Sequence, residues 1–241
     1  MADKAAVIIG AGDALGGAIA RRFAREGYAA VIVRRQADQL EPLAQAIREA
    51  GGEAHPFGLD ARQEDAMVGL FDKVEAEIAP IEVCVFNIGA NVRFPIAETT
   101  ARVYFKVWEM AAFAGFLAGR EAAKRMTPRG RGTILFTGAT ASVRGGEGFA
   151  AFAGAKHAVR ALAQSMAREL GPKGVHVAHT IIDGAIDTAW IAENFPERYA
   201  MKAQDGILNP EHIADAYWML HAQPRDSWTH ELDLRPWKEA W

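Results

Sequence analysis

The chain has 241 residues, half of them hydrophobic and 24% charged, which is typical of a globular protein and excludes a disordered one. Its net charge of −3 leaves no positive excess for binding nucleic acid. Charged residues interrupt every hydrophobic stretch before it reaches about 18 residues, so no segment is expected to enter a membrane. The single cysteine, Cys84, lies in an apolar run, and the N-terminus shows no signal peptide, so we expect a cytoplasmic protein.

Short apolar runs rich in branched residues alternate with longer segments of helical period. The runs lack polar alternation, as expected of strands that are buried on both faces of a parallel sheet. They are Ala5–Ile9, Ala30–Val33, Val83–Phe86, Thr133–Phe136 and Val175–Ile182. This alternation predicts an α/β fold, a Rossmann-like doubly wound parallel sheet, with residues 1–241 forming a single domain.

The helical segments carry apolar residues on one face. In the first, Leu15, Ile19 and Phe23 lie four residues apart, and Gly27 ends the helix. The others are Leu40–Ala50, Arg62–Ile78, Val103–Met126 and Phe149–Leu170. The last two are rich in Ala and Gly, which favours close helix packing either inside the core or at a subunit interface. The C-terminal sequence THELDLRP predicts an edge strand or an oligomer contact.

The first strand is followed by a glycine-rich turn, GAGDALGG at 10–17, and then by a helix. Glycines at this junction let the backbone turn sharply and approach a pyrophosphate, whose charge the helix N-terminus stabilises. The alternative is a purely structural turn. Because the turn joins a strand to an amphipathic helix, we favour a dinucleotide site.

Arg34 and Arg35 stand at the end of the second strand, where an NAD-specific site usually has an acidic residue for the ribose 2′-hydroxyl. Two guanidinium groups can instead bind a 2′-phosphate, so NADP(H) is favoured over NAD(H) and over a merely solvated basic loop. Asp60 follows a third apolar run and is predicted either to lie beside the adenine or to cap the helix that follows.

Together these segments resemble the short-chain dehydrogenase/reductase family, from about residue 7 to 188. IIGAGDALGGAIA is similar to the family's TGxxxGxG turn, FNIGA to its NNAG segment, and the stretch IIDGAIDT to its PG motif, with Asp183 in place of the proline. The resemblance implies a nicotinamide dinucleotide cofactor and a homodimer or homotetramer. The expected cofactor contacts are Gly10, Gly12, Asp13, Leu15, Gly16, Arg34, Arg35, Asp60, Ala61, Asn87, Ile88, Gly89, Lys156, Gly184, Ile186 and Thr188.

The family's catalytic signature is YxxxK, with a serine before the tyrosine and an asparagine on the preceding helix. Here FAGAK supplies Lys156, but Phe152 takes the tyrosine position, Ala139 the serine position and Ala111 the asparagine position. A positioned general acid typically contributes about 10²–10⁴-fold to a rate, and phenylalanine has no proton to give. We therefore expect a retained cofactor site and impaired ketone–alcohol interconversion, with Lys156 still able to hold the ribose hydroxyls.

Four other side chains are candidates for the missing proton donor. Ser142 and Thr140 are short hydroxyls near the serine position, although a role in the turn is the alternative. Tyr199 lies in the segment 187–206, which in this family usually forms a lid over the substrate. Asp183, at a strand end, is predicted to act as an acid or to cap the following turn. The seven histidines show no metal-binding spacing, so no metal is expected.

Two functions remain open. The first is an NADP(H)-dependent oxidoreductase that reduces a small carbonyl, conjugated enoyl or imine compound without the family's tyrosine. The second is a catalytically inactive NADP(H)-binding sensor or partner subunit, which the three apolar replacements favour. The aromatic residues of the lid, Trp190, Phe195 and Tyr199, favour the first because they suit a small-molecule pocket.

Overall fold

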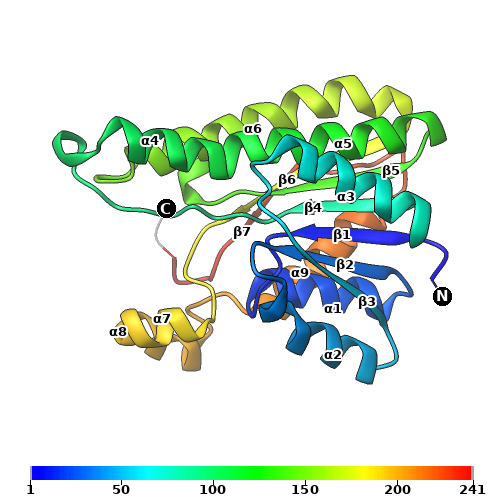
Figure 1. The fold of residues 1–241 in the computed structure, drawn as a ribbon. Helices are drawn as coiled ribbons and strands as arrows, with labels where there is room; N and C mark the ends of the chain where they lie inside the picture. The colour runs from blue at the N-terminus through cyan, green and yellow to red at the C-terminus, as the bar shows by residue number, and fades with distance from the viewer. Residues whose placement is uncertain (1, 240–241) are drawn as a thin grey trace.

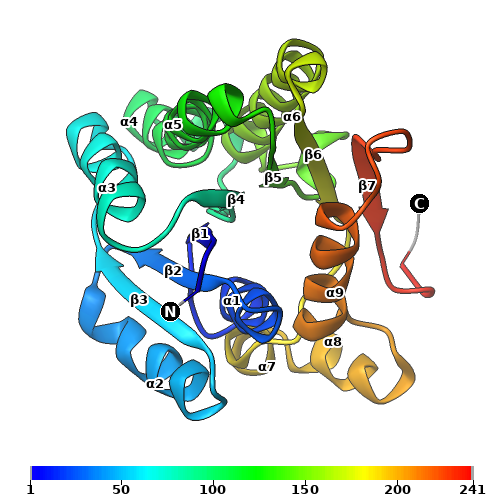
Figure 2. The ribbon, with the colours of Figure 1, turned by 90° about the vertical axis from the view of Figure 1, so that its right-hand side faces the viewer.

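The computed structural model describes residues 2–239, which form one seven-stranded sheet with helices on both faces (Figures 1 and 2). The strands follow the spatial order β3-β2-β1-β4-β5-β6-β7, and every neighbouring pair is parallel. Their bounds are β1 Ala5–Ile9, β2 Ala29–Arg34, β3 Glu53–Gly58, β4 Ile81–Phe86, β5 Gly132–Thr137, β6 Val175–Ile182 and β7 Glu231–Leu234. The predicted Rossmann-like α/β fold is therefore confirmed.

The helices form two layers, one on each face of the sheet (Figure 2). One layer holds α1 (Leu15–Arg25), α2 (Glu41–Glu49) and α9 (Pro210–His221); the other holds α3 (Glu64–Glu77), α4 (Ala101–Trp108), α5 (Ala114–Arg129) and α6 (Ala150–Leu170). Along β1, Val7 and Ile9 belong to the core under α3, α5 and α6, whereas Ala6 and Ile8 belong to the core under α1 and α9. Both faces are buried, which is why the central strand β1 is apolar at every position, whereas the edge strands β3 and β7 carry charged residues.

The long helix predicted at 103–126 is interrupted. A π-helical turn, Glu109–Phe113, separates α4 from α5, and α5 continues to Arg129. A Cβ added at Gly115 would lie 3.2 Å from the Phe86 ring, and one at Gly119 would lie 2.9 Å from Met166 of α6. Gly115 and Gly119 of α5 therefore allow close packing inside the core, which is one of the two roles predicted for these small residues; the other was a subunit interface.

Other elements differ from the prediction mainly at their ends. Strands β2, β4 and β5 are one or two residues longer at one end or both, because pairing with their neighbours continues beyond the fully apolar core. The THELDLRP sequence forms β7, which pairs with β6 as an edge strand. The segment 187–206 forms two short helices, α7 (Ala189–Asn194) and α8 (Pro196–Ala200), and a 3₁₀ turn at Met201–Gln204. Among residues 2–239, no helix is long and apolar enough to cross a membrane.

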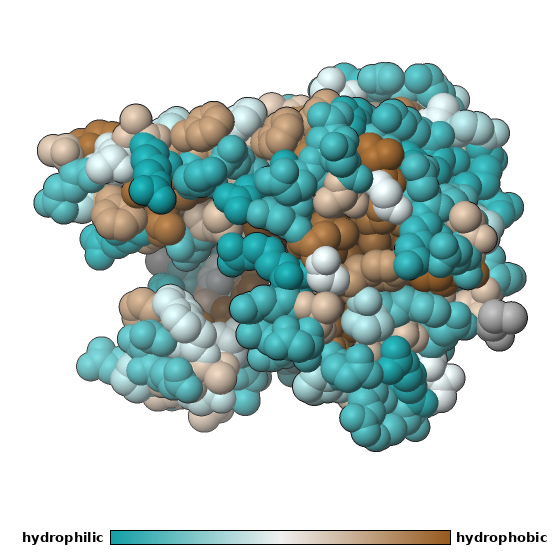
Figure 3. All heavy atoms as spheres, in the orientation of Figure 1, coloured by the Kyte–Doolittle hydropathy of each residue, from teal (hydrophilic) through white to brown (hydrophobic). Residues whose placement is uncertain are grey.

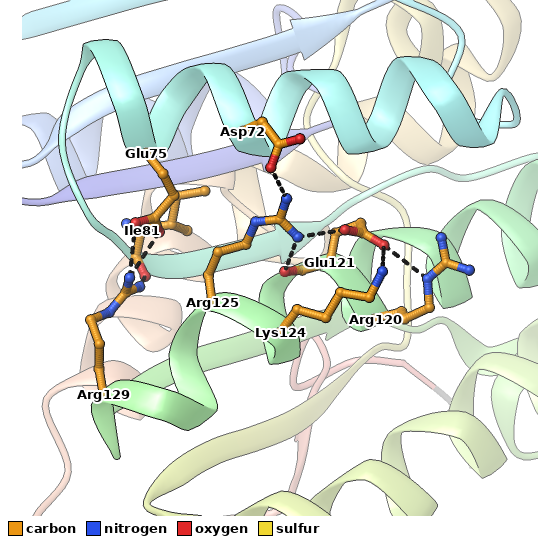
Figure 4. A network of polar contacts seen from close by, with 8 residues as sticks. All are labelled: Asp72, Glu75, Ile81, Arg120, Glu121, Lys124, Arg125 and Arg129. Atoms are coloured by element: carbon orange, nitrogen blue, oxygen red, sulfur yellow. Dashed lines mark hydrogen bonds and ion pairs between the residues drawn. The ribbon is translucent and has the colours of Figure 1, made fainter.

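A charged network joins α5 to α3 (Figure 4). Its centre is Glu121, whose side chain is 1% exposed and binds Arg120, Lys124 and Arg125. Arg125 also pairs with Asp72 of α3. Burial raises the pKa of Glu121, but the hydrogen bonds from the three cations outweigh burial and hold that pKa below its ordinary value. One turn further on, Arg129 binds Glu75 and the carbonyl oxygen of Ile81, so the network also fixes the start of β4.

Candidate active site

The glycine-rich turn lies at the carboxyl end of β1, where the strand order reverses between β1 and β4. Gly10 has a φ of +94°, and a Cβ there would lie 2.7 Å from the carbonyl oxygen of Asn87. A Cβ at Gly16 would overlap the carbonyl oxygen of Gly10. Asn87 donates its side-chain amide to that same oxygen at 3.1 Å. Only glycine fits these positions, so the turn lies tightly against the end of β4.

The N-terminus of α1 is open toward the space in front of the turn. Its N-cap residue, Ala14, offers no side-chain hydrogen bond, and no acidic residue stands in the first helical turn. No atom lies within 4 Å of a Cβ added at Gly12. The first N–H groups of α1 are therefore available to an anion such as a pyrophosphate.

Beside the turn, a cavity of about 370 Å³ opens between the ends of β2 and β3. Its walls include Arg34 and Arg35, and within residues 2–239 neither guanidinium makes a hydrogen bond or an ion pair. Asp60 lies across from them and accepts hydrogen bonds from the backbone and the guanidinium of Arg62, which hold the pKa of its carboxyl below the ordinary value. Asp60 thus closes the turn after β3 and lines the cavity. The alternative that it caps the following helix is wrong, because α3 begins at Glu64 and its N-cap residue is Gln63, whose side chain makes no capping hydrogen bond.

A second cavity, of about 910 Å³, continues from the first and shares the glycine turn and the Asn87–Gly89 segment with it. Figure 3 shows the surface hollowed between the lobe that carries α7 and α8 and the part that carries α4. Every residue expected to contact the cofactor lines one of the two cavities. Gly184, Ile186 and Thr188 line the second, and Thr188 also caps α7 by accepting the N–H of Ile191 at 3.1 Å.

Lys156 lies in the wall of the second cavity and is 2% exposed. Its ammonium donates to the carbonyl oxygens of Ile88 at 3.0 Å and Thr137 at 2.8 Å, which join the ends of β4 and β5. No carboxylate of residues 2–239 contacts it, and burial lowers its pKa from 10.5 to about 8. The Phe152 ring, one helical turn earlier, lies with its centroid 5.9 Å from the Lys156 nitrogen.

The three residues expected at the family's catalytic positions lie together. Ala111, at 0% exposure, and Phe152, at 7%, belong to one apolar cluster, and Ala139 packs against it. Ala111 is in the π-helical turn between α4 and α5, and π-helical turns are frequent at functional sites. The corner of the cavity where the family's tyrosine, serine and asparagine are expected is therefore lined by apolar side chains.

The alternative proton donors are placed differently from one another. Ser142 is fully buried, accepts the Ala139 N–H at 3.1 Å and does not line the cavity; Tyr199 does not line it either, and its hydroxyl lies 3.4 Å from Lys202. Thr140 lines the cavity and donates its hydroxyl to Asp183. Asp183, 2% exposed, is tied to the loop after β5 and lies behind the cavity wall.

Arg62 and Arg144 are among the wall residues that sequence reasoning did not predict. Arg62 lines the smaller cavity, and its position two residues after Asp60 in the DAR triplet was the available signal. Arg144 lines the larger cavity from the loop after β5, and no sequence pattern marks it.

Comparison with known proteins accounts for this arrangement. The family model for short chain dehydrogenases matches residues 4–198. The chain belongs to the short-chain dehydrogenase family. It is 30% identical to cis-4-hydroxycyclohexanecarboxylate dehydrogenase of Sinomonas cyclohexanicum, over 89% of this chain and 88% of that protein. The chain is thus an oxidoreductase-family protein, and the resemblance inferred from its motifs is confirmed.

Solved structures agree with this membership. A short-chain dehydrogenase from Rhodopseudomonas palustris is 48% identical, with a TM-score of 0.85 over 98% of this chain and 100% of that one. An alcohol dehydrogenase from Thermococcus sibiricus, complexed with 5-hydroxy-NADP, is 27% identical, with a TM-score of 0.86 over 98% of both chains.

Proposed function

We propose that this short-chain dehydrogenase family member is an NADP(H)-dependent oxidoreductase whose reaction does not use an ionisable tyrosine. The observation that carries the proposal is the pair of connected cavities. Arg34 and Arg35, which have no ion-pair partner among residues 2–239, line one, and Lys156 lies beneath an apolar corner in the other. NADP(H), when bound, supplies or accepts a hydride at its nicotinamide ring. The second cavity, at about 910 Å³, has room for that ring and a small molecule.

The cofactor preference rests on the charge around the smaller cavity. Within residues 2–239, Arg34 and Arg35 make no hydrogen bond or ion pair with a carboxylate, whereas Arg62 is bound to Asp60; Arg35 acts on Asp60 only at longer range. Two free guanidinium groups fit a 2′-phosphate, and each charge-assisted hydrogen bond contributes about 1.5–3 kcal/mol. The Thermococcus sibiricus relative is complexed with an NADP derivative, which supports the same choice.

The residues at the apolar corner limit the reaction type. Phe152 and Ala139 offer neither a proton nor a hydroxyl to an oxyanion, so a substrate that accepts hydride without forming a localised oxyanion suits the site better than a simple ketone. A conjugated enoyl compound or a protonated imine meets this condition, and a small carbonyl compound is the remaining option. Lys156 holds the ribose hydroxyls in this scheme.

A catalytically inactive NADP(H)-binding sensor or partner subunit is the second candidate. The observation in its favour is that Ala111, Ala141 and Phe152 pack on one another as a small hydrophobic core. This candidate binds the cofactor and turns over no substrate.

A titration followed by an activity panel separates the candidates. NADPH and NADH are titrated into the wild-type protein and into Arg34→Ala/Arg35→Ala, and binding is followed by fluorescence. Carbonyl, enoyl-thioester and imine compounds are then added one at a time, and the oxidation of NADPH is followed by its absorbance. We expect NADPH to bind at least about tenfold more tightly than NADH, and the double variant to lose this preference. Oxidation of NADPH by any compound supports an enzyme, and binding without turnover supports the sensor. Failure to bind either nucleotide contradicts both.

We also propose that the protein assembles as a homodimer or homotetramer. The outward side of the α4–α5 layer carries a row of stacked rings, Phe105, Trp108, Phe113 and Phe116, with neighbouring centroids 6.1–6.3 Å apart. Three of them are 39–55% exposed, and contiguous exposed aromatic surface is typical of a protein interface.

A further inference from the structure

The part of the large cavity away from the glycine turn has two apolar walls. One consists of Ala139, Ala141, Phe149 and Phe152, and the other is the lid, where Trp190 and Phe195 lie with ring centroids 5.3 Å apart. Trp190 is 57% exposed and Phe195 is 47% exposed. Aromatic rings on a lid gain free energy when an apolar ligand covers them, so these walls suit a compound with an apolar body.

The charges on these walls do not balance. Asp13 belongs to the glycine-rich turn, and Arg198 and Glu239 pair with each other at 3.6 Å on the lid side. Lys156 lies beside Phe152, but it is 2% exposed and already donates to two carbonyl oxygens. Arg144 remains, and its ion partner Asp183 does not line the cavity. The ligand space therefore meets one positive charge that no neighbouring wall residue neutralises.

Arg144 keeps most of its hydrogen-bonding capacity. Within residues 2–239 its guanidinium makes one polar contact, a long one of 3.5 Å to Oδ1 of Asp183, and that oxygen already accepts the Thr140 hydroxyl. The other oxygen of Asp183 is 3.2 Å from Arg235. Since a guanidinium has five N–H donors in a planar fork, Arg144 can bind a second carboxylate while Asp183 holds it in place from behind. Its side chain is 45% exposed, which leaves it accessible to a ligand.

We infer that Arg144 binds the carboxylate of a small acid whose alicyclic or aromatic body lies between Phe152 and the lid rings. This inference rests on the proposed function, because it assigns a substrate class to the same cavity. A carboxylate is preferred to a phosphate since the site offers a single planar cation with one net charge. The acid enters with its apolar part toward the apolar corner and its charge toward the loop after β5.

Paired probes test the inference. Benzoate and cyclohexanecarboxylate are compared with benzamide and cyclohexanecarboxamide, which have nearly the same shape and no charge. Binding is measured by calorimetry, with and without saturating NADP⁺, for wild type, Arg144→Gln and Arg144→Lys. The control is Arg168→Gln, which removes an exposed arginine of α6 whose guanidinium, within residues 2–239, hydrogen-bonds only to the Gln164 carbonyl.

We expect wild type and Arg168→Gln to bind each acid at least about tenfold more tightly than its amide, and Arg144→Gln to bind the two about equally. Arg144→Lys keeps the charge without the fork, so its preference is expected to fall between the two. Equal binding of acid and amide by wild type, or a preference that survives in Arg144→Gln, overturns the inference. Failure of NADP⁺ to bind counts against the proposed function alone, because the titration without nucleotide still measures the acid preference. Unfolding midpoints identify any variant that is misfolded.

Discussion

Lys156 and Phe152 lie one turn apart on α6, and their contacts give them different roles. Lys156 donates to the carbonyl oxygens of Ile88 and Thr137, so it joins two strand ends whether or not the chain performs chemistry. Two buried carbonyl groups that lost this donor would each cost about 1–3 kcal/mol. Phe152 has only to fill space beside Ala111. The lysine thus has a structural role that the tyrosine hydroxyl lacks.

Restoring the hydroxyl at 152 tests whether this corner is the reaction site. Phe152 lines the cavity, so the oxygen of Phe152→Tyr would project toward the ligand and beside Lys156. We expect NADPH-dependent reduction of cyclohexanone to rise by about tenfold or more, and further in Phe152→Tyr/Ala139→Ser, since a positioned acid contributes up to about 10⁴-fold. The rate is measured by NADPH absorbance. Phe149→Tyr, in the same wall, is the matched control and should change little; equal rates in both single variants would count against this corner.

The burial of Lys156 also predicts a pH dependence of stability. Its pKa falls from 10.5 to about 8 in the folded chain, so between these values the unfolded chain binds more protons and folding becomes more favourable as pH rises. We expect the stability of wild type, relative to Lys156→Met, to increase by up to about 3 kcal/mol from pH 7.5 to 10.5. Urea unfolding at several pH values measures it. Lys73→Met, at an exposed position, provides the reference, and parallel pH curves for wild type and Lys156→Met would contradict the prediction.

At the scale of elements, the Glu121 network holds α5 against α3 (Figure 4). Glu121→Gln replaces an almost fully buried carboxylate by a neutral amide among three cations that are 15–55% exposed, and the loss of hydrogen bonds to a charged group costs about 1.5–3 kcal/mol. We expect the urea midpoint to fall accordingly. The control, Glu77→Gln, removes an exposed carboxylate 3.8 Å from Lys73 and should cost less than about 0.5 kcal/mol. Similar losses in both variants would show that burial of Glu121 is not the cause.

Elements whose limits depend on local residues were predicted well. β1 and β6 have the predicted bounds, because an apolar run bounded by turn residues is sufficient to define a buried parallel strand. The π-helical turn at 109–113 was not predicted, since it changes the backbone hydrogen-bond register without any break in the apolar pattern. The position of Arg144 was not predictable for a similar reason. It depends on how the loop after β5 packs against Asp183, the residue that follows β6, and these two residues are distant in sequence.

At the scale of the whole molecule, a cofactor bound in the two cavities should raise the free energy of unfolding of the chain. A nucleotide that binds only the folded chain stabilises it by about 2.7 kcal/mol at a concentration of 100 times Kd. We expect NADPH at that concentration to raise the unfolding midpoint of wild type, and to have a smaller effect on Arg34→Ala/Arg35→Ala, whose own midpoint without nucleotide should stay near that of wild type. Calorimetric scanning measures the shifts. Equal shifts in both proteins would contradict the assignment of the 2′-phosphate site.

The exposed aromatic row on α4 and α5 makes the assembly itself testable. Trp108 and Phe116, 39% and 40% exposed, lie in that row, and a subunit interface would bury them. We expect light scattering after gel filtration to give a dimer or tetramer for wild type and a monomer for Trp108→Glu/Phe116→Glu, because a buried charge without a partner opposes association. Met219→Glu changes an equally exposed residue in the opposite helix layer and should leave the assembly intact. A monomeric wild type, or an assembly that survives the double substitution, would show that these rings serve another purpose.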